Sequence, residues 1–440
     1  MFKRIFLLGL SLFFSHWVCS ADKPNVLLVL LDDMGYGDIG ANGAQSISTP
    51  NIDALAASGA NFSNFYASAN VCTPSRAGLL TGLYPIRTGL AHGVVEAKGD
   101  DRGLPKDIEN IAKLLKREDY VTKMVGKWHL GNFPKYHPLD YGFDEFYGVP
   151  FSNDMAGFTI YDGRQAISGD VDQALLSKSF TDQAIDFIEQ KRDKPFFLFL
   201  SHSMPHIPLF ASEKFKGRSQ AGLYGDVIEE LDWNMGRLIK ALKQQGLYEN
   251  TLIIFTSDNG PFFEGSVAGL KGGKGSSYDG GFRVPLIVSW PNKLSSAKRI
   301  DSVSMNIDIL PTVADAVGLD KAADFDGLSL LPILNGQDPQ REYLYFFNNE
   351  DVIAVRSQRW KYLIQTYYRT SIGDFSKFGQ LPGFKSPYDL LFDMQAPTGE
   401  RYSLADRFPQ VLERHRAELT AAGQKFDSLR TRPKAKTFPQ

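Results

Sequence analysis

Long apolar runs constrain the fold of this 440-residue chain more than any other feature of its sequence. Residues 25–31, 195–200 and 251–256 are nearly uninterrupted apolar segments, which are typical of parallel strands buried on both faces. Further strands are expected at residues 120–125 and 284–288. Segments with helical spacing separate the strands, at residues 49–57, 108–116, 180–190 and 222–245. This alternation predicts an α/β fold, with a doubly wound and mostly parallel sheet flanked by helices.

Polar residues that could carry chemistry follow the ends of these strands. They are Asp32, Asp33, Lys127, His129, His206, Asp258 and Asn259. In doubly wound sheets the site lies beyond the carboxyl ends of the strands, so we expect these side chains to meet. Taken separately, the Asp-Asp and Asp-Asn pairs could equally be turn residues that close a strand.

Four of these residues would offer only oxygen atoms to a metal ion. They are Asp32, Asp33, Asp258 and Asn259. Hard oxygen ligands favour Ca²⁺ or Mg²⁺ over Zn²⁺, and Ca²⁺ tolerates an irregular oxygen cage better than Mg²⁺ does. The sequence therefore predicts a site for a hard divalent cation, Ca²⁺ or Mg²⁺, at this edge of the sheet.

The first 21 residues read as a signal peptide. Lys3 and Arg4 precede an apolar run from Ile5 to Phe14, which is too short to span a bilayer, so no stable membrane insertion is expected. Cys19 is not expected to carry a lipid, because Val18 before it is not the small residue that a lipobox requires. We expect an exported protein, periplasmic or extracellular, or in a lysosome-type lumen if the source is eukaryotic.

Cleavage would leave Cys72 as the single cysteine of the exported chain, without a disulfide partner. An unpaired thiol is unusual in an oxidising compartment, and chemical conversion of Cys72 would explain its presence. The alternative is a buried cysteine that acts as a small hydrophobic residue.

The charge balance limits which partners are expected, and the pattern of short strands and a helix indicates the domains. The chain has 48 Lys and Arg against 50 Asp and Glu, without a basic stripe, so nucleic acid is not expected as a partner. Residues 22–335 are expected to form a catalytic domain. Residues 336–440 show short strand patterns, as at 360–364, and a closing helical pattern at 411–426, which predict a smaller α+β domain with a short antiparallel sheet.

The stretch Cys72-Thr73-Pro74-Ser75-Arg76, followed by Thr81-Gly82, resembles the C-x-P-S-R…T-G signature of the type I sulfatases. The segment 126–131, Gly-Lys-Trp-His-Leu-Gly, is similar to arylsulfatase A-like members of this family. The resemblance implies the alkaline phosphatase-like sulfatase fold. It also implies that a formylglycine-generating maturation enzyme oxidises Cys72 to formylglycine, whose hydrate has two hydroxyls. One hydroxyl attacks sulfur and the other later expels sulfate, which splits one hard step into two easier ones.

The resemblance also implies roles for individual residues. The four oxygen-bearing residues after the strands would bind one Ca²⁺, and an oxygen of matured Cys72 would complete its shell. Asp258 would also act as the base that activates the attacking hydroxyl. Arg76 would bind the diol and the calcium ligands, while Lys127 and Lys274 would bind sulfate oxygens. His129 would assist the release of sulfate, and His206 would contact the sulfate and protonate the leaving group.

These interpretations predict a sulfuric ester hydrolase that acts on an aryl or carbohydrate sulfate. A phosphate or phosphonate monoester hydrolase on the same fold is the alternative enzyme, because such a site binds any tetrahedral oxyanion. A protein that binds sulfated glycan without hydrolysis is the alternative if Cys72 is not matured.

Overall fold

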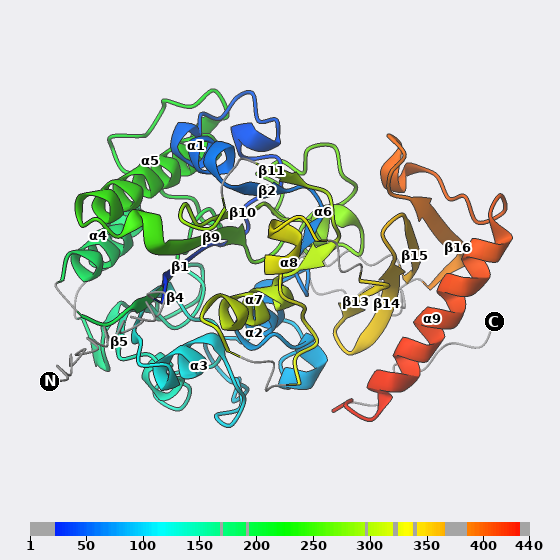
Figure 1. Ribbon diagram of the computed structural model, residues 1–440, viewed down its shortest axis with the longest axis horizontal. Helices are drawn as coiled ribbons and strands as arrows, with labels where there is room; N and C mark the ends of the chain where they lie inside the picture. The colour runs from blue at the N-terminus through cyan, green and yellow to red at the C-terminus, as the bar shows by residue number, and fades with distance from the viewer. Residues whose placement is uncertain are drawn as a thin grey trace, which may run out of the picture.

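A large mixed sheet lies at the centre of the computed structural model of the protein (Figure 1). The structure describes residues 23–167, 170–190, 193–294, 298–319, 324–337, 341–365 and 385–431, so the predicted signal peptide at 1–21 lies outside the described residues. The sheet has ten strands in the order β11-β2-β10-β9-β1-β8-β4-β5-β6-β7. They are β1 (Asn25–Leu31), β2 (Ala60–Phe62), β4 (Val121–Lys127), β5 (Glu145–Val149), β6 (Tyr161–Asp162), β7 (Gln165–Ala166), β8 (Phe196–Ser201), β9 (Thr251–Ser257), β10 (Leu286–Ser289) and β11 (Lys298–Ile300).

The five central strands, β9-β1-β8-β4-β5, are all parallel, and β10 runs antiparallel to β9. Leu28 pairs with Phe199 on one side and with Ile254 on the other, so β1 is at the centre of the sheet. Two short strands, β3 (Phe65–Tyr66) and β12 (Ser304–Met305), form a separate parallel pair. The predicted, mostly parallel sheet is therefore confirmed.

Helices cover both faces of the sheet. The helices are α1 (Pro50–Ser58), α2 (Cys72–Thr81), α3 (Ile111–Arg117), α4 (Leu176–Glu189), α5 (Gly222–Gln244), α6 (Asp279–Phe282), α7 (Ile309–Ala316), α8 (Leu331–Leu334) and α9 (Pro409–Asp427). Leu28 of β1 belongs to a buried core with α2, α3 and α7, whereas its neighbour Leu27 belongs to a core with α1, α4 and α5. Successive residues of a strand face opposite sides, so an uninterrupted apolar strand serves both cores.

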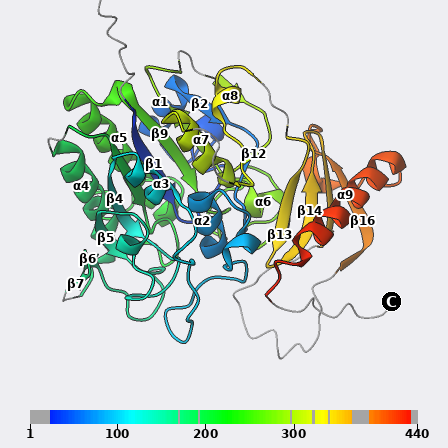
Figure 2. The ribbon, with the colours of Figure 1, turned by 60° about the horizontal axis from the view of Figure 1, so that its bottom comes forward.

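A second sheet lies at the C-terminal end of the chain (Figures 1 and 2). Strands β13 (Leu344–Asn348), β14 (Asp351–Arg356), β15 (Trp360–Gln365) and β16 (Lys385–Asp393) form an antiparallel sheet in that order. Helix α9 covers the face of this sheet that points away from the large sheet. The expected small antiparallel sheet with a closing helix is thus confirmed. The domain boundary at 335/336 stays a prediction, because one apolar core joins Tyr66 and Phe282 to Phe346 across it.

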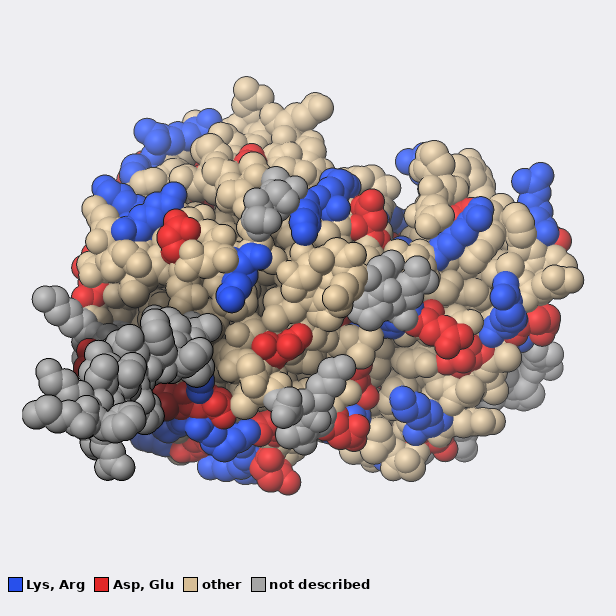
Figure 3. Space-filling view, viewed as in Figure 1, with Lys and Arg blue, Asp and Glu red and all other residues tan. Residues whose placement is uncertain are grey.

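The surface matches the balanced composition. Basic and acidic side chains are interspersed on the face drawn in Figure 3. Within the described part of the chain, the helices are too short or too polar to cross a lipid bilayer.

Candidate active site

Helix α2 begins at Cys72, after an extended Val71, and places this side chain at the floor of a pocket of about 530 Å³. Pro74 occupies the third helical position, where a missing N–H costs no intrahelical hydrogen bond. The helix N-terminus directs partial positive charge toward the pocket, which suits an oxyanion. Burial raises the pKa of the Cys72 thiol to about 12, although Lys127 and Lys274 act in the opposite direction. An unmodified Cys72 is therefore a thiol at neutral pH.

Arg76 lies one turn after Cys72 and is buried with its charge paired. Its Nε and Nη2 each lie 2.8 Å from Asp258 Oδ2. Its Nη1 donates to the carbonyl oxygen of Lys127 at 2.9 Å and to Ser201 Oγ at 2.7 Å. A buried guanidinium requires such partners, so Arg76 fixes α2 against the carboxyl ends of β4, β8 and β9.

The carboxylates that follow β1 and β9 lie side by side because these strands are parallel neighbours in register, with Leu31 opposite Ser257. The backbone N–H of Asp33 donates to Asp258 Oδ1 at 3.1 Å, and Asn259 Nδ2 donates to Asp33 Oδ1 at 2.7 Å. Asp33 has a φ of 66°, in the left-handed region that is strained for most residues other than glycine. Strain of this kind is concentrated at functional sites.

Two lysines neutralise these carboxylates. Lys127 Nζ lies 2.5 Å from Asp32 Oδ2, and Lys274 Nζ lies 2.6 Å from Asp33 Oδ2. Burial acts to raise the pKa of Asp32, but Lys127 and its other cationic neighbours hold it well below its usual range. Burial raises the pKa of Asp258 to about 6, with Arg76 opposing the shift and Asp32 adding to it. Lys127 is the last residue of β4 rather than a residue beyond it, because the strand continues in register with Val149.

The oxygen-rich cluster fits a calcium ion. Among the described residues, the buried Oδ1 atoms of Asp32 and Asn259 have no hydrogen-bond partner. Potential ligand atoms of Asp32, Cys72 and Asp258 lie within 4.8 Å of one another, as do those of Asp33, Cys72 and His206. Unpaired buried oxygens beside several carboxylates are what a hard divalent cation would satisfy. The donor set therefore agrees with the predicted ion.

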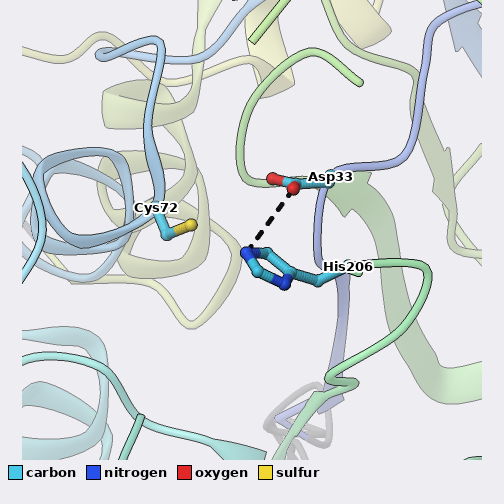
Figure 4. A group of neighbouring side chains, drawn as sticks. All are labelled: Asp33, Cys72 and His206. Atoms are coloured by element: carbon cyan, nitrogen blue, oxygen red, sulfur yellow. Dashed lines mark ion pairs between the residues drawn. The ribbon is translucent and has the colours of Figure 1, made fainter. Parts of the chain in front are cut away.

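Two histidines face this cluster. Figure 4 shows the sulfur of Cys72, the carboxylate of Asp33 and the imidazole of His206 turned toward one another. His206 Nε2 lies 3.7 Å from Asp33 Oδ2, and its Nδ1 lies 2.6 Å from the carbonyl oxygen of Ile207. Burial and the charge of Lys274 lower the pKa of His206.

His129 lines the same pocket and has a φ of 57°. Its Nε2 lies 3.1 Å from the carbonyl oxygen of Val95, and its buried Nδ1 has no hydrogen-bond partner among the described residues. Burial and the charges of Lys127 and Arg76 hold the pKa of His129 well below its usual range. The imidazole is therefore neutral and can accept a proton at one nitrogen.

The structure brings all ten residues singled out from the sequence into this one region. It also adds hydroxyl groups to which sequence reasoning gave no role. Thr73 Oγ1 donates to the carbonyl oxygen of His129 at 2.9 Å, and Ser75 Oγ donates to that of Asp258. Both residues belong to the Cys72 motif, and this membership is the sequence feature that could have indicated their role. Ser201, which binds Arg76, carried no signal beyond its place at the end of β8.

The chain matches known proteins over most of its length. A sequence model described as Sulfatase matches residues 24–319, and one described as N-sulphoglucosamine sulphohydrolase, C-terminal, matches residues 273–380. Arylsulfatase A of Bos taurus is 34% identical over 91% of this chain and 87% of its own length. N-acetylgalactosamine-6-sulfatase of Mus musculus is 33% identical over 90% of this chain and 86% of its own length.

The fold is also similar to that of solved structures. The crystal structure of Ps i-CgsB in complex with k-i-k-neocarrahexaose superposes with a TM-score of 0.79 at 28% identity, and it covers 91% of this chain and 93% of its own. The resemblance to the type I sulfatases of the alkaline phosphatase superfamily is thereby confirmed. The chain is an enzyme that belongs to the sulfatase family, whose members hydrolyse sulfate esters.

Proposed function

We propose that this sulfatase is an exported, calcium-dependent enzyme that releases inorganic sulfate from an aryl or carbohydrate sulfate, with formylglycine derived from Cys72 as its nucleophile. The observation that carries the proposal is the position of Cys72. It lies at the N-terminus of α2, on the floor of the pocket, beside cationic side chains and beside carboxylate and amide oxygens that have no hydrogen-bond partner in the part of the chain that the structure describes. Export through the predicted signal peptide and conversion by a formylglycine-generating enzyme are parts of the same proposal.

Formylglycine, once hydrated, would supply one hydroxyl that attacks sulfur and a second that expels sulfate. Bound Ca²⁺ would supply positive charge beside a sulfate oxygen. Asp32, Asp33, Asp258 and Asn259 would hold this ion. The three carboxylates lie around Cys72, Asn259 contacts Asp33, and the Oδ1 atoms of Asp32 and Asn259 lack hydrogen-bond partners among the described residues. Asp258 would take the proton of the attacking hydroxyl, because its carboxylate lies beside Cys72 in the same buried cluster.

The cationic side chains would bind the sulfuryl group and stabilise its charge in the transition state. Lys274 lines the pocket directly, and Lys127 is held at the end of β4 through Asp32. Arg76 would orient Asp258 through its two contacts of 2.8 Å. Each of these groups is fixed by a buried partner, so little reorganisation is needed when charge develops.

The two histidines would move protons at opposite stages of the reaction. His206 would protonate the leaving oxygen, and the negative charge of a bound sulfate would favour its imidazolium form. His129 would take a proton from the second hydroxyl when sulfate is expelled, because its Nδ1 is buried and unpaired among the described residues. Both side chains line the pocket together with Cys72.

Rates on matched esters test this proposal. The protein is purified from a host that converts Cys72, and turnover of 4-nitrophenyl sulfate, 4-nitrophenyl phosphate and a sugar sulfate is compared with that of Cys72→Ala. We expect sulfate esters to be preferred and the variant to be inactive. A clear preference for phosphate would favour the phosphate or phosphonate monoester hydrolase. Tight binding of a sulfated glycan without turnover by converted protein would favour a binding protein.

A further inference from the structure

The pocket above Cys72 has the Lys274–Asp33 ion pair and His206 at its floor, and two exposed carboxylates at its mouth. Glu96 and Asp154 are the exposed acidic residues that line the same pocket. Glu96 lies between the 3-10 helix at Pro85–Thr88 and α3, and Asp154 follows β5. Both residues are exposed, and among the described residues neither carboxylate makes an ion pair or a hydrogen bond. They are therefore available to a ligand.

One cation and one aromatic ring also line this part of the pocket. Lys98 is exposed in the same segment as Glu96, so two carboxylates and one ammonium leave the mouth with a net charge of −1. Phe262 follows β9 and contacts Phe263 edge to face, with ring centroids 4.5 Å apart. Phe262 is half-buried, which holds its ring in place while one part still lines the pocket.

These groups differ in what they can bind. An ionised carboxylate only accepts hydrogen bonds, so Glu96 and Asp154 favour a partner that carries hydroxyls. They repel a second sulfate or a carboxylate, which is how a binding site excludes a competing ligand. The ring of Phe262 can pack against the apolar face of a sugar or against an aryl ring. The pocket volume of about 530 Å³ lies within the usual range for small-ligand sites.

We propose that the mouth of this pocket selects a neutral, hydroxyl-bearing ring as the leaving group and discriminates against a second anionic group beside the scissile ester. Glu96 and Asp154 accept hydrogen bonds from ring hydroxyls, and Phe262 covers the apolar face of the ring. This inference rests on the proposed function, because it assigns the leaving-group side of the same site.

The test compares three substrates: a hexose carrying one sulfate, the same hexose carrying a second sulfate, and 4-nitrophenyl sulfate, which has no hydroxyl. Wild type should have a kcat/KM for the monosulfated hexose at least about tenfold above that for the disulfated hexose. Glu96→Gln and Asp154→Asn should each lower kcat/KM for the monosulfated hexose by about five- to tenfold, since hydrogen bonds to charged acceptors are the stronger ones. In both variants the ratio of kcat/KM for the monosulfated hexose to that for the disulfated hexose should fall. The kcat/KM for 4-nitrophenyl sulfate should not change.

Three further measurements separate the individual roles. Glu249→Gln removes an exposed carboxylate at the opposite edge of the sheet, before β9, and should change none of the rates. Phe262→Ala should raise KM for the hexose and the aryl sulfate alike, because both rings would lose the same surface. In roughly 1 M NaCl, where the Debye length is about 3 Å, discrimination against the disulfated hexose should shrink.

Two outcomes would overturn the inference. One is a wild-type preference for the disulfated hexose that Lys98→Gln abolishes, because the ammonium would then set the charge preference. The other is an equal loss on all three substrates in Glu96→Gln and Asp154→Asn. Failure of converted wild type to hydrolyse any of the three sulfate esters would count against the proposed function instead.

Discussion

Lys361 of the C-terminal sheet forms a buried ion pair with Asp279 of helix α6, with Nζ and Oδ1 2.9 Å apart. The same Nζ lies 2.7 Å from Glu400 Oε1, and Glu400 Oε2 accepts a 2.6 Å hydrogen bond from the backbone N–H of Asp279. Helix α6 follows directly on the loop that carries Lys274, and the N–H of Gly280 donates to the carbonyl oxygen of Lys271. The second sheet is therefore joined by buried charges to the segment that holds a pocket lysine.

Replacing Lys361 by Met should lower the free energy of unfolding by roughly 3–5 kcal/mol, because Asp279 and Glu400 would remain buried without their shared cation. The midpoint of urea unfolding measures this change. Lys194→Met is the matched control, since Lys194 pairs with Asp119 at an exposed site, where an ion pair contributes about 0–1 kcal/mol. Equal shifts in the two variants would contradict the special role of Lys361.

The stability of the protein should depend on the titration of Glu400. Burial raises the pKa of Glu400 to about 7 from a usual value of 4.5, with Lys361 opposing the shift and Asp279 adding to it. Between these two values the folded state keeps a proton that the unfolded state has lost. Stability should therefore fall as the pH rises through this range, by up to about 1.4 kcal/mol per pH unit.

Urea unfolding of wild type and Glu400→Gln between roughly pH 5 and pH 8 isolates this contribution, because the glutamine cannot titrate. The free energy of unfolding of wild type should fall relative to that of the variant as the pH rises. The pKa of Asp279 is lowered to about 2: burial acts to raise it, and Lys361 and Arg356 outweigh burial, so its titration lies outside this range. A constant difference between the two proteins would show that Glu400 does not titrate there.

Much of the fold was predictable because its central strands are continuous apolar runs, which can be recognised in the sequence without knowledge of tertiary contacts. The antiparallel direction of β10 (Leu286–Ser289) was not, since a short apolar segment carries no information on its orientation. The edge strands β6 (Tyr161–Asp162) and β7 (Gln165–Ala166) have two residues each, too few for a periodic pattern.

The site residues were predictable for a different reason. Asp32, Asp258 and Lys127 all lie at the carboxyl ends of parallel strands, so the topology itself brings them together. Glu96 and Asp154 lie in loops whose positions depend on tertiary packing, and the sequence there has no pattern. Lys361 and Glu400 would pass for exposed charges, and their burial becomes intelligible only from their mutual contact.

Asp258→Ala should abolish calcium binding and lower turnover by about 100-fold or more, since the proposed site would lose a carboxylate ligand and the general base. Calcium content after dialysis, measured by atomic emission, checks the first effect. Asn259→Asp tests the same site with less disturbance, because it keeps the size of the side chain and an oxygen at the position of the buried Oδ1, which has no hydrogen-bond partner among the described residues; it should keep more calcium than Asp258→Ala. Asp324→Ala, at an exposed carboxylate, is the control. Full calcium content in Asp258→Ala would remove this residue from the proposed shell.

His206→Ala should slow hydrolysis of a sugar sulfate by about 10²–10⁴-fold and that of 4-nitrophenyl sulfate by much less. A sugar alkoxide leaves poorly without a proton, whereas nitrophenolate does not need one. The ratio of kcat values for the two substrates is the measurement. His92→Ala, whose ring pairs with Glu350 outside the pocket, should leave the ratio unchanged. Equal losses on both substrates in His206→Ala would argue against a role as acid.

The chain should be inactive until Cys72 is oxidised. A thiol could at most form a sulfated enzyme, because without a second hydroxyl on the same carbon it could not expel sulfate. Conversion replaces CH₂SH by CHO and lowers the mass by about 18 Da. Mass spectrometry of the peptide that contains Cys72 gives the aldehyde fraction, which varies between preparations from hosts with and without the maturation enzyme. Activity should rise in proportion to this fraction and vanish at zero. Full turnover by protein whose Cys72 is entirely thiol would end the assignment of Cys72 as the precursor of the nucleophile.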